Sequence, residues 1–178
     1  MNLEEKLKNG KFVITTEVCP PKGTNIDSLI GQAEHLKNKV DAFNVTDLQS
    51  SVMRAGSLIT CHLLLERGLE PVFQITCRDR NRLALQSDLL SANIVGINNV
   101  LVLTGDHPVL GDHPQAKPVF DLDSVSLLKA ASGLMAGKDM VGNNLDGIPN
   151  FFLGAVVNPG YEPLELQIIK MEKKIVAG

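Results

Sequence analysis

The sequence repeats one pattern along most of its length: an apolar run rich in β-branched or aromatic residues, then a polar residue, then an amphipathic segment. The runs begin near Phe12, Ala42, Pro71, Asn99 and Phe151. The first four begin about 30 residues apart, which is the length of one strand–helix unit. Several are apolar at odd and even positions alike, as expected of strands buried on both faces. The pattern predicts a parallel α/β fold.

Segments with a helical spacing of apolar residues lie between the runs and after the last one. They cover residues 26–40, 53–67, 82–94, 123–136 and 163–174. No sixth run follows, and about five strand–helix units cannot close a barrel that needs eight. We therefore predict a (βα)8 TIM-barrel type fold with only about five units present, forming a single domain over residues 1–178. Either a partner completes the sheet or, as we favour, the chain is the N-terminal portion of a longer barrel.

Polar side chains stand where the strand-like runs end. In a parallel barrel the carboxyl ends of all strands open on one face, and that face carries the chemistry. Residues far apart in the sequence are therefore expected to form one site. These residues are Glu17, Thr46, Asp47, Gln74, Thr76, Asp106 and Asn158.

Composition and short motifs narrow the class of protein. The chain has a net charge of -3 and no basic stripe with interleaved aromatic residues, so nucleic-acid binding is not expected. No apolar run approaches the ~18 residues of a membrane helix. Three widely spaced cysteines predict reduced thiols in a cytoplasmic protein. The spacing of His107 and His113 is no standard ligand pattern, so no metal is expected. Nucleotide-binding glycine motifs are missing.

Six segments resemble, in the same order, the methylenetetrahydrofolate reductase family. The resemblance spans essentially the whole chain, and each segment alone is a weak signal. The segments are 16–23 (TEVCPPKG), 44–47 (NVTD), 74–81 (QITCRDRN), 103–108 (LTGDHP), 120–124 (FDLDS) and 172–178 (EKKIVAG).

The resemblance implies an FAD-containing barrel that reduces 5,10-methylenetetrahydrofolate to 5-methyltetrahydrofolate in one-carbon metabolism and methionine biosynthesis. The electrons would come from NAD(P)H or another donor, which the sequence does not identify. The resemblance also implies that roughly the last third of the barrel is absent from this chain. The state of association, as a homo-oligomer or with a partner subunit, is left open.

The same resemblance assigns roles to individual residues. Glu17 would be the general acid that protonates N10 of the folate, and its neighbours Val18 and Cys19 favour the protonated form. Asp106 would lie close to flavin N1 and the pterin ring. The remaining cofactor-binding residues would be Thr46, Asp47, Gln74, Thr104, Gly105, Asn158 and Lys174. Gln74 and Thr104 depart from the family pattern, which often has histidine and arginine there.

Simpler interpretations compete with each assignment. Glu17 can cap a turn or pair with a lysine, and Asp106 can be an ordinary turn residue. Lys174 can be a solvated residue whose positive charge is favourable at the end of a helix. Arg78 and Arg80 are expected to form local salt bridges. Two other functions remain: a flavin-free pterin-binding barrel that transfers a methyl group, and a non-catalytic subunit that completes a partner's barrel.

Overall fold

The computed structural model describes all 178 residues and contains a five-stranded parallel sheet in the order β1-β2-β3-β4-β5. The strands are β1 (Thr15–Val18), β2 (Ala42–Val45), β3 (Pro71–Thr76), β4 (Asn99–Leu103) and β5 (Phe152–Ala155). A helix follows each strand: α2 (Asp27–Leu36), α3 (Ser57–Leu65), α4 (Arg82–Ile94), α5 (Ser124–Met135) and α6 (Leu164–Ala177). The parallel α/β prediction is confirmed, and the sequential strand order is consistent with part of a (βα)8 barrel.

Several boundaries differ from the sequence prediction, and one helix was not predicted. Helix α2 ends at Leu36 instead of residue 40, and α6 continues to Ala177 instead of ending at residue 174. Strand β1 begins at Thr15, because Phe12 is 90% exposed and pairs with no strand. Helix α3 begins at Ser57, four residues after the predicted start at Met53. The unpredicted helix is α1 (Leu3–Lys8), which is too short to show an apolar period but carries a capping box between Asn2 and Glu5.

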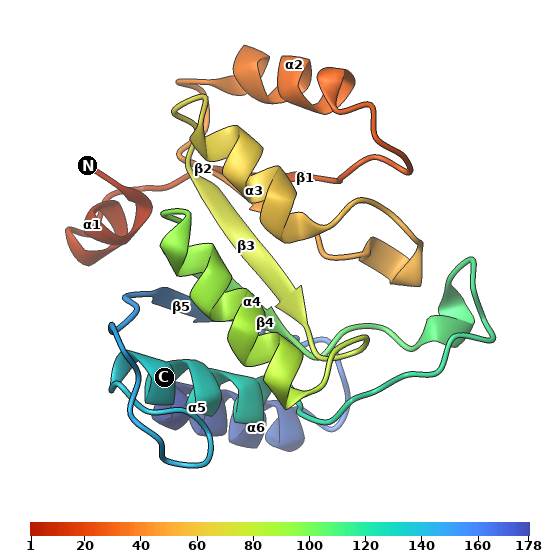
Figure 1. Ribbon diagram of the computed structural model, residues 1–178, viewed down its shortest axis with the longest axis vertical. Helices are drawn as coiled ribbons and strands as arrows, with labels where there is room; N and C mark the ends of the chain where they lie inside the picture. Colours follow the sequence, from red (N-terminus) through yellow and green to blue (C-terminus); the bar gives the residue numbers. More distant parts are fainter.

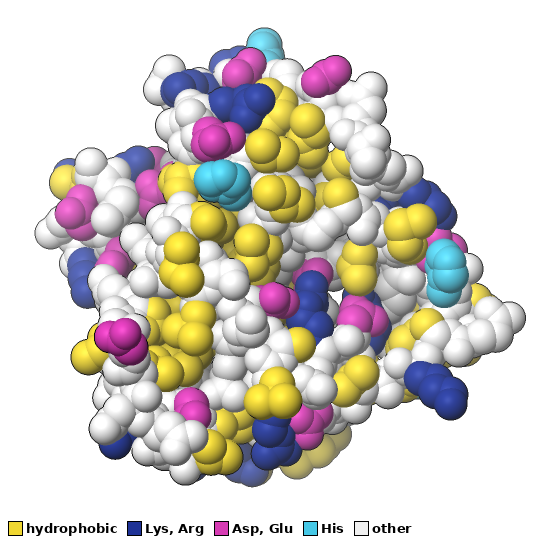
Figure 2. All heavy atoms as spheres, in the orientation of Figure 1, with side chains coloured by type: hydrophobic (Ala, Val, Ile, Leu, Met, Phe, Trp, Pro, Cys, Tyr) yellow, Lys and Arg dark blue, Asp and Glu magenta, His cyan; other side chains and the backbone are white.

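The main core lies between the sheet and the helices α2 to α5, which cover one face of the sheet (Figure 1). Alternate strand residues such as Phe43, Phe73 and Val100 point into this core. They meet helix residues such as Leu64 and Leu89, both of which are completely buried. On the outer surface of these helices, basic and acidic side chains are interspersed among apolar ones (Figure 2).

The opposite face of the sheet is polar toward the carboxyl ends of its strands. Toward the amino ends, Leu3 from α1 packs on Ala42 and Val72 in a small second cluster. Further along the same strands the alternation brings Asn44 and Gln74 to this face. Glu17 pairs in register with Asn44 and is exposed. The strands therefore present an apolar end and a polar end on one surface, and the polar end faces the loops that follow the strands.

Those loops contain two short 3-10 helices, η1 (Gln49–Ser51) after β2 and η2 (Pro108–Leu110) after β4. Both lie beyond the carboxyl end of β3, at the right of Figure 1. The amino ends of the strands, together with α1, lie on the other side of the molecule.

Candidate functional site

A cavity of about 240 Å³ opens at the carboxyl ends of β1 to β4. Its lining brings together residues that are up to 89 positions apart in the sequence, between Glu17 and Asp106. All the predicted site residues except Asn158 and Lys174 line it. These are Glu17, Thr46, Asp47, Gln74, Thr76, Thr104, Gly105 and Asp106.

Glu17 and Gln74 form one wall of the cavity. They stand two strands apart, and the amide Nε2 of Gln74 donates a long hydrogen bond of 3.5 Å to Oε1 of Glu17. Gln74 is buried, whereas Glu17 is exposed. Val18, one of the expected apolar neighbours, points into the helix-side core instead. The carboxylate of Glu17 is therefore open to a ligand and has only the neutral Gln74 amide as a protein partner.

Thr46 contributes a buried hydroxyl without a partner. The residue is 2% exposed, and its Oγ1 makes no hydrogen bond within the chain. Its backbone amide is bonded to the carbonyl of Val18 at 3.1 Å, which fixes the position of the side chain. A buried hydroxyl without a hydrogen bond is costly, and such a group in a cavity wall is a natural contact for a ligand.

Asp47 lines the cavity, but its carboxylate is committed to partners in the protein. Its side chain has no exposed surface and accepts hydrogen bonds from the amide and the hydroxyl of Thr76, both at 2.9 Å. Arg80 adds bonds of 2.7 and 3.2 Å, and also pairs with Asp88 at 2.9 Å. Burial by itself lowers the pKa of Arg80, but the hydrogen bond to Asp47 and the surrounding carboxylates raise it overall. Asp47 therefore ties β2 to β3 and to the loop before α4.

Thr104, Gly105 and Asp106 follow β4 and form the far side of the cavity. Thr104 accepts a hydrogen bond from the amide of Ser124 at 3.2 Å, which joins the strand end to the start of α5. Gly105 has φ of +92°, and a Cβ there would lie 3.1 Å from Cβ of both Thr76 and Arg78. Only glycine fits this position without strain. Asp106 is exposed, and no protein group bonds to its carboxylate.

Asn158 and Lys174 lie outside the cavity. Asn158 is exposed and its Oδ1 accepts a bond from the amide of Gly160 at 3.1 Å, within its own turn. Lys174 donates to the carbonyl of Val156 at 2.6 Å. Burial lowers the pKa of Lys174, and the nearby charge of Lys170 acts in the same direction. Neither residue contributes to the cavity wall, so their assignment as cofactor-binding residues stays a prediction.

Several residues that line the cavity were not assigned to the site from the sequence. Arg78 is 2% exposed and forms the predicted local salt bridge, with Asp79 at 2.7 Å. Leu48 and Ser50 come from the loop after β2 and line the cavity as well. Both have positive φ, at 50° and 54°. Such values carry no sequence signal in leucine and serine, so only the structure places this loop at the site.

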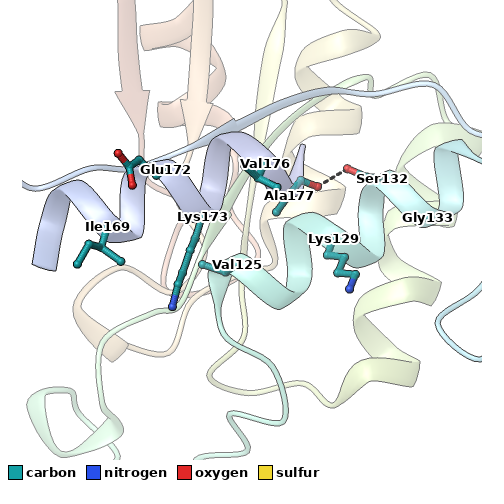
Figure 3. A pocket seen from close by; sticks show the side chains of 9 residues that line it. All are labelled: Val125, Lys129, Ser132, Gly133, Ile169, Glu172, Lys173, Val176 and Ala177. Atoms are coloured by element: carbon teal, nitrogen blue, oxygen red, sulfur yellow. Dashed lines mark hydrogen bonds between the residues drawn. The ribbon is translucent and has the colours of Figure 1, made fainter.

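A larger hollow of about 770 Å³ lies elsewhere, between α5 and α6 (Figure 3). Its walls include Val125, Ile169 and Val176, with Lys129 and Lys173 at the edges. The hydroxyl of Ser132 bridges the two helices by donating to the carbonyl of Ala177 at 2.7 Å. None of the predicted site residues lies here, and its apolar character differs from that of the cavity at the strand ends.

Comparison with known proteins decides the family. A family model described as methylenetetrahydrofolate reductase matches residues 2–178. The chain belongs to the methylenetetrahydrofolate reductase family. A curated relative, methylenetetrahydrofolate reductase 2 of Schizosaccharomyces pombe, is 31% identical over 127 residues, which is 66% of this chain. The matched segment covers 19% of that yeast protein. Thus the family resemblance read from the sequence is confirmed.

Two further features bear on the class of protein. No helix of the structure is both long and apolar enough to cross a membrane. All three cysteines are free; Cys61 and Cys77 are buried, and Cys19 is partly exposed. In this member of the methylenetetrahydrofolate reductase family, the candidate site is the polar cavity at the carboxyl ends of the strands.

Proposed function

We propose that this chain forms the flavin- and folate-binding wall of a barrel that reduces 5,10-methylenetetrahydrofolate to 5-methyltetrahydrofolate with FAD. The observation that carries the proposal is the convergence of Glu17, Thr46, Gln74 and Asp106 on one cavity in a chain of this family. Two of these groups, the carboxylates of Glu17 and Asp106, are exposed. Glu17 is carried by β1, and Asp106 lies in the loop that follows β4.

The residues present fit a flavin. Thr46 offers a buried hydroxyl that lacks a partner, and Gln74 offers an amide whose nitrogen donates only one long hydrogen bond, to Glu17. The backbone at Gly105 has no side chain, so a flat ring can approach it closely. A volume of about 240 Å³ is below the roughly 300–1,000 Å³ of sites that enclose a whole ligand. The residues that line this cavity would thus form one side of the flavin site, and Thr46, Gln74, Thr104 and Gly105 would hold the ring.

Bound FAD supplies hydride transfer, which amino-acid side chains cannot perform. The chemical task that remains for the protein is to open the five-membered ring of the substrate, because a hydride is accepted by the iminium cation and not by the closed ring. Ring opening breaks the bond between the methylene carbon and N10, and N10 then takes up a proton. Glu17 would supply that proton, because its carboxyl lines the cavity and its only hydrogen-bond partner in the protein is the Gln74 amide.

Asp106 serves recognition and electrostatics. Its free carboxylate can accept hydrogen bonds from the N–H groups of a pterin ring. A negative charge there also disfavours extra negative charge on a neighbouring ring, so it sets how readily reduction occurs. The simpler interpretation, in which Asp106 only shapes a turn, is weakened because its side chain bonds to no backbone group.

The proposal is tested with the protein expressed together with any sequence that follows Gly178 in its gene. FAD is added, reduced with dithionite so that the natural electron donor is not needed, and then mixed anaerobically with methylenetetrahydrofolate. Recovery of the oxidised flavin absorbance reports transfer to the substrate. Glu17→Gln should slow this recovery by about 10²–10⁴-fold, the usual contribution of a general acid.

Glu165→Gln is the matched control, because Glu165 is exposed in the first turn of α6, outside the cavity. It should recover at the rate of the unmodified protein. Flavin that binds and is reduced, but is never reoxidised by the folate, would contradict the proposed reaction. Equal rates for Glu17→Gln and the control would remove Glu17 from the mechanism.

A further inference from the structure

The carboxylate of Asp106 is free, but its backbone is held by a chain of hydrogen bonds from two other loops. The hydroxyl of Ser51, in η1, lies 2.9 Å from the carbonyl oxygen of Asp106 and 3.2 Å from that of His107, and donates to them. Arg78 in turn donates from Nη1 to the Ser51 hydroxyl at 3.1 Å. Asp106 is thus fixed from the loops that follow β2 and β3.

Arg78 is a rigid anchor for this chain of bonds. It is 2% exposed, and Asp79 binds its Nε at 2.9 and 3.0 Å and its Nη2 at 2.7 Å. Its Cβ packs under Gly105, the residue before Asp106. A guanidinium held in this way by a carboxylate has little freedom to move, so it fixes the hydroxyl of Ser51.

The backbone around Ser51 is strained, which indicates that the arrangement is maintained by its contacts. Leu48, Ser50 and Ser51 all have left-handed φ values, of 50°, 54° and 58°. Such conformations in residues other than glycine persist only when the surroundings enforce them, and they concentrate at functional sites. The loop after β2 also contacts the loop after β4 at Gly111. There the backbones are so close that an added Cβ would lie 1.8 Å from the carbonyl oxygen of Ser51.

A second tie lies further along the loop after β4. Asp112 accepts from the amide of Met53 at 3.0 Å, and it forms an ion pair with Lys22 from the loop after β1. The loop that carries Asp106 is therefore bound to the three preceding loops. Only the bond from Ser51, however, reaches Asp106 itself.

We propose that Ser51, anchored by Arg78, is a positioning residue that sets where the carboxylate of Asp106 stands in the site. The inference rests on the proposed function, because Asp106 has a role in the reaction only if flavin and folate bind here. Ser51 acts through the backbone of Asp106 and contacts no reacting atom.

The first test uses the protein without FAD, so it does not depend on the reaction. Hydrogen exchange is measured at the amide of Leu110, which donates to the carbonyl of His107 at 3.0 Å. Ser51→Ala should speed this exchange by about two- to tenfold, the effect of losing one hydrogen bond. Ser87→Ala, at an exposed position of α4, is the control and should change nothing. Unchanged exchange in Ser51→Ala would overturn the inference.

The second test is a double-mutant cycle in the FAD-loaded protein. Ser51→Ala should lower kcat/KM by about tenfold, since small displacements of a catalytic group are costly. In the background of Asp106→Asn the same change should cost less than about twofold, because the group that Ser51 positions is gone. Equal losses in both backgrounds would overturn the inference.

Ser51→Gly separates the hydroxyl from the backbone conformation, because glycine adopts the left-handed conformation without strain. It should behave like Ser51→Ala, and activity like that of the unmodified protein would overturn the inference. The outcomes also distinguish the two proposals. If Ser51→Ala speeds exchange but the unmodified protein fails to bind added FAD, the proposed function is refuted, and with it the role of Ser51 in this reaction. Normal FAD chemistry with an inert Ser51 would refute only the inference.

Discussion

Replacing Asp47 with alanine should destabilise the protein more than any substitution of an exposed carboxylate. The Asp47 side chain is fully buried and accepts bonds from the amide and hydroxyl of Thr76 and from two nitrogens of Arg80. Asp47→Ala leaves the amide of Thr76 without its acceptor and removes one carboxylate from Arg80. Breaking a buried ion pair from one side costs about 3–5 kcal/mol.

The lower end of that range applies here, because Arg80 keeps its bond to Asp88 and its side chain is 21% exposed. We expect a loss of about 3 kcal/mol in the free energy of unfolding. For a chain of this size that corresponds to a fall in Tm of about 6–12 °C. Asp47→Asn keeps an acceptor for Thr76 and should cost less, about 1–2 kcal/mol.

Urea denaturation followed by circular dichroism measures these changes, with Asp146→Ala as the control. Asp146 is exposed and has no hydrogen-bond or ion-pair partner, so its removal should change stability by less than about 0.5 kcal/mol. A loss below about 1 kcal/mol for Asp47→Ala would refute the reasoning. It would mean that the carboxylate is available to a ligand, as predicted from the sequence.

Two further predictions concern the glycine beside Asp106 and the cysteines. Gly105→Ala should lower stability by about 1–3 kcal/mol in a thermal melt, because φ is +92° and the new Cβ would press on Thr76 and Arg78. The control Gly31→Ala lies inside α2 with open space around it, and should instead stabilise the protein by about 0.5–1 kcal/mol. Equal effects of the two substitutions would contradict the account. Burial raises the pKa of Cys77 to about 12 and raises the pKa of Cys61 further, so both stay protonated and unreactive at pH 8. A thiol-reactive dye should then label only Cys19 in the folded protein and all three cysteines in denaturant, and rapid labelling of two or more thiols in the folded protein would contradict this burial.

Much of the fold could be predicted because strands buried in a parallel sheet have a plain sequence signature. The apolar runs near Ala42, Pro71 and Asn99 each became a strand beginning at that residue. The strand start predicted near Phe12 was wrong, because the first residues of that run are apolar but exposed. Strand pairing begins only at Thr15. Helix α1 was missed because six residues are too few to show a period.

The location of the candidate site could also be predicted, because the carboxyl ends of parallel strands meet at one edge. That rule is sufficient to bring Glu17, Gln74 and Asp106 together from the sequence alone. The state of each side chain could not be predicted. Asp47 is occupied by Arg80, a residue 33 positions away whose direction depends on the folded loop. The exposure of Glu17 depends on which segments cover the polar face of the sheet, and the residues next to Glu17 in the sequence do not indicate this.

The contribution of the loop after β2 could not be predicted either. Its left-handed backbone at Leu48, Ser50 and Ser51 is set by contacts with Arg78 and with the loop after β4. Those contacts join segments that are 27 or more positions apart, so no local pattern of residues indicates them.

The most direct test of the central claim is the absorption spectrum of the purified protein, expressed with any sequence that follows Gly178 in its gene. The account predicts flavin bands near ~450 nm, either on purification or after added FAD is taken up, that bleach on reduction and return with methylenetetrahydrofolate. A folded protein that stays colourless and takes up no FAD would contradict it, and would favour a flavin-free pterin-binding barrel or a non-catalytic subunit.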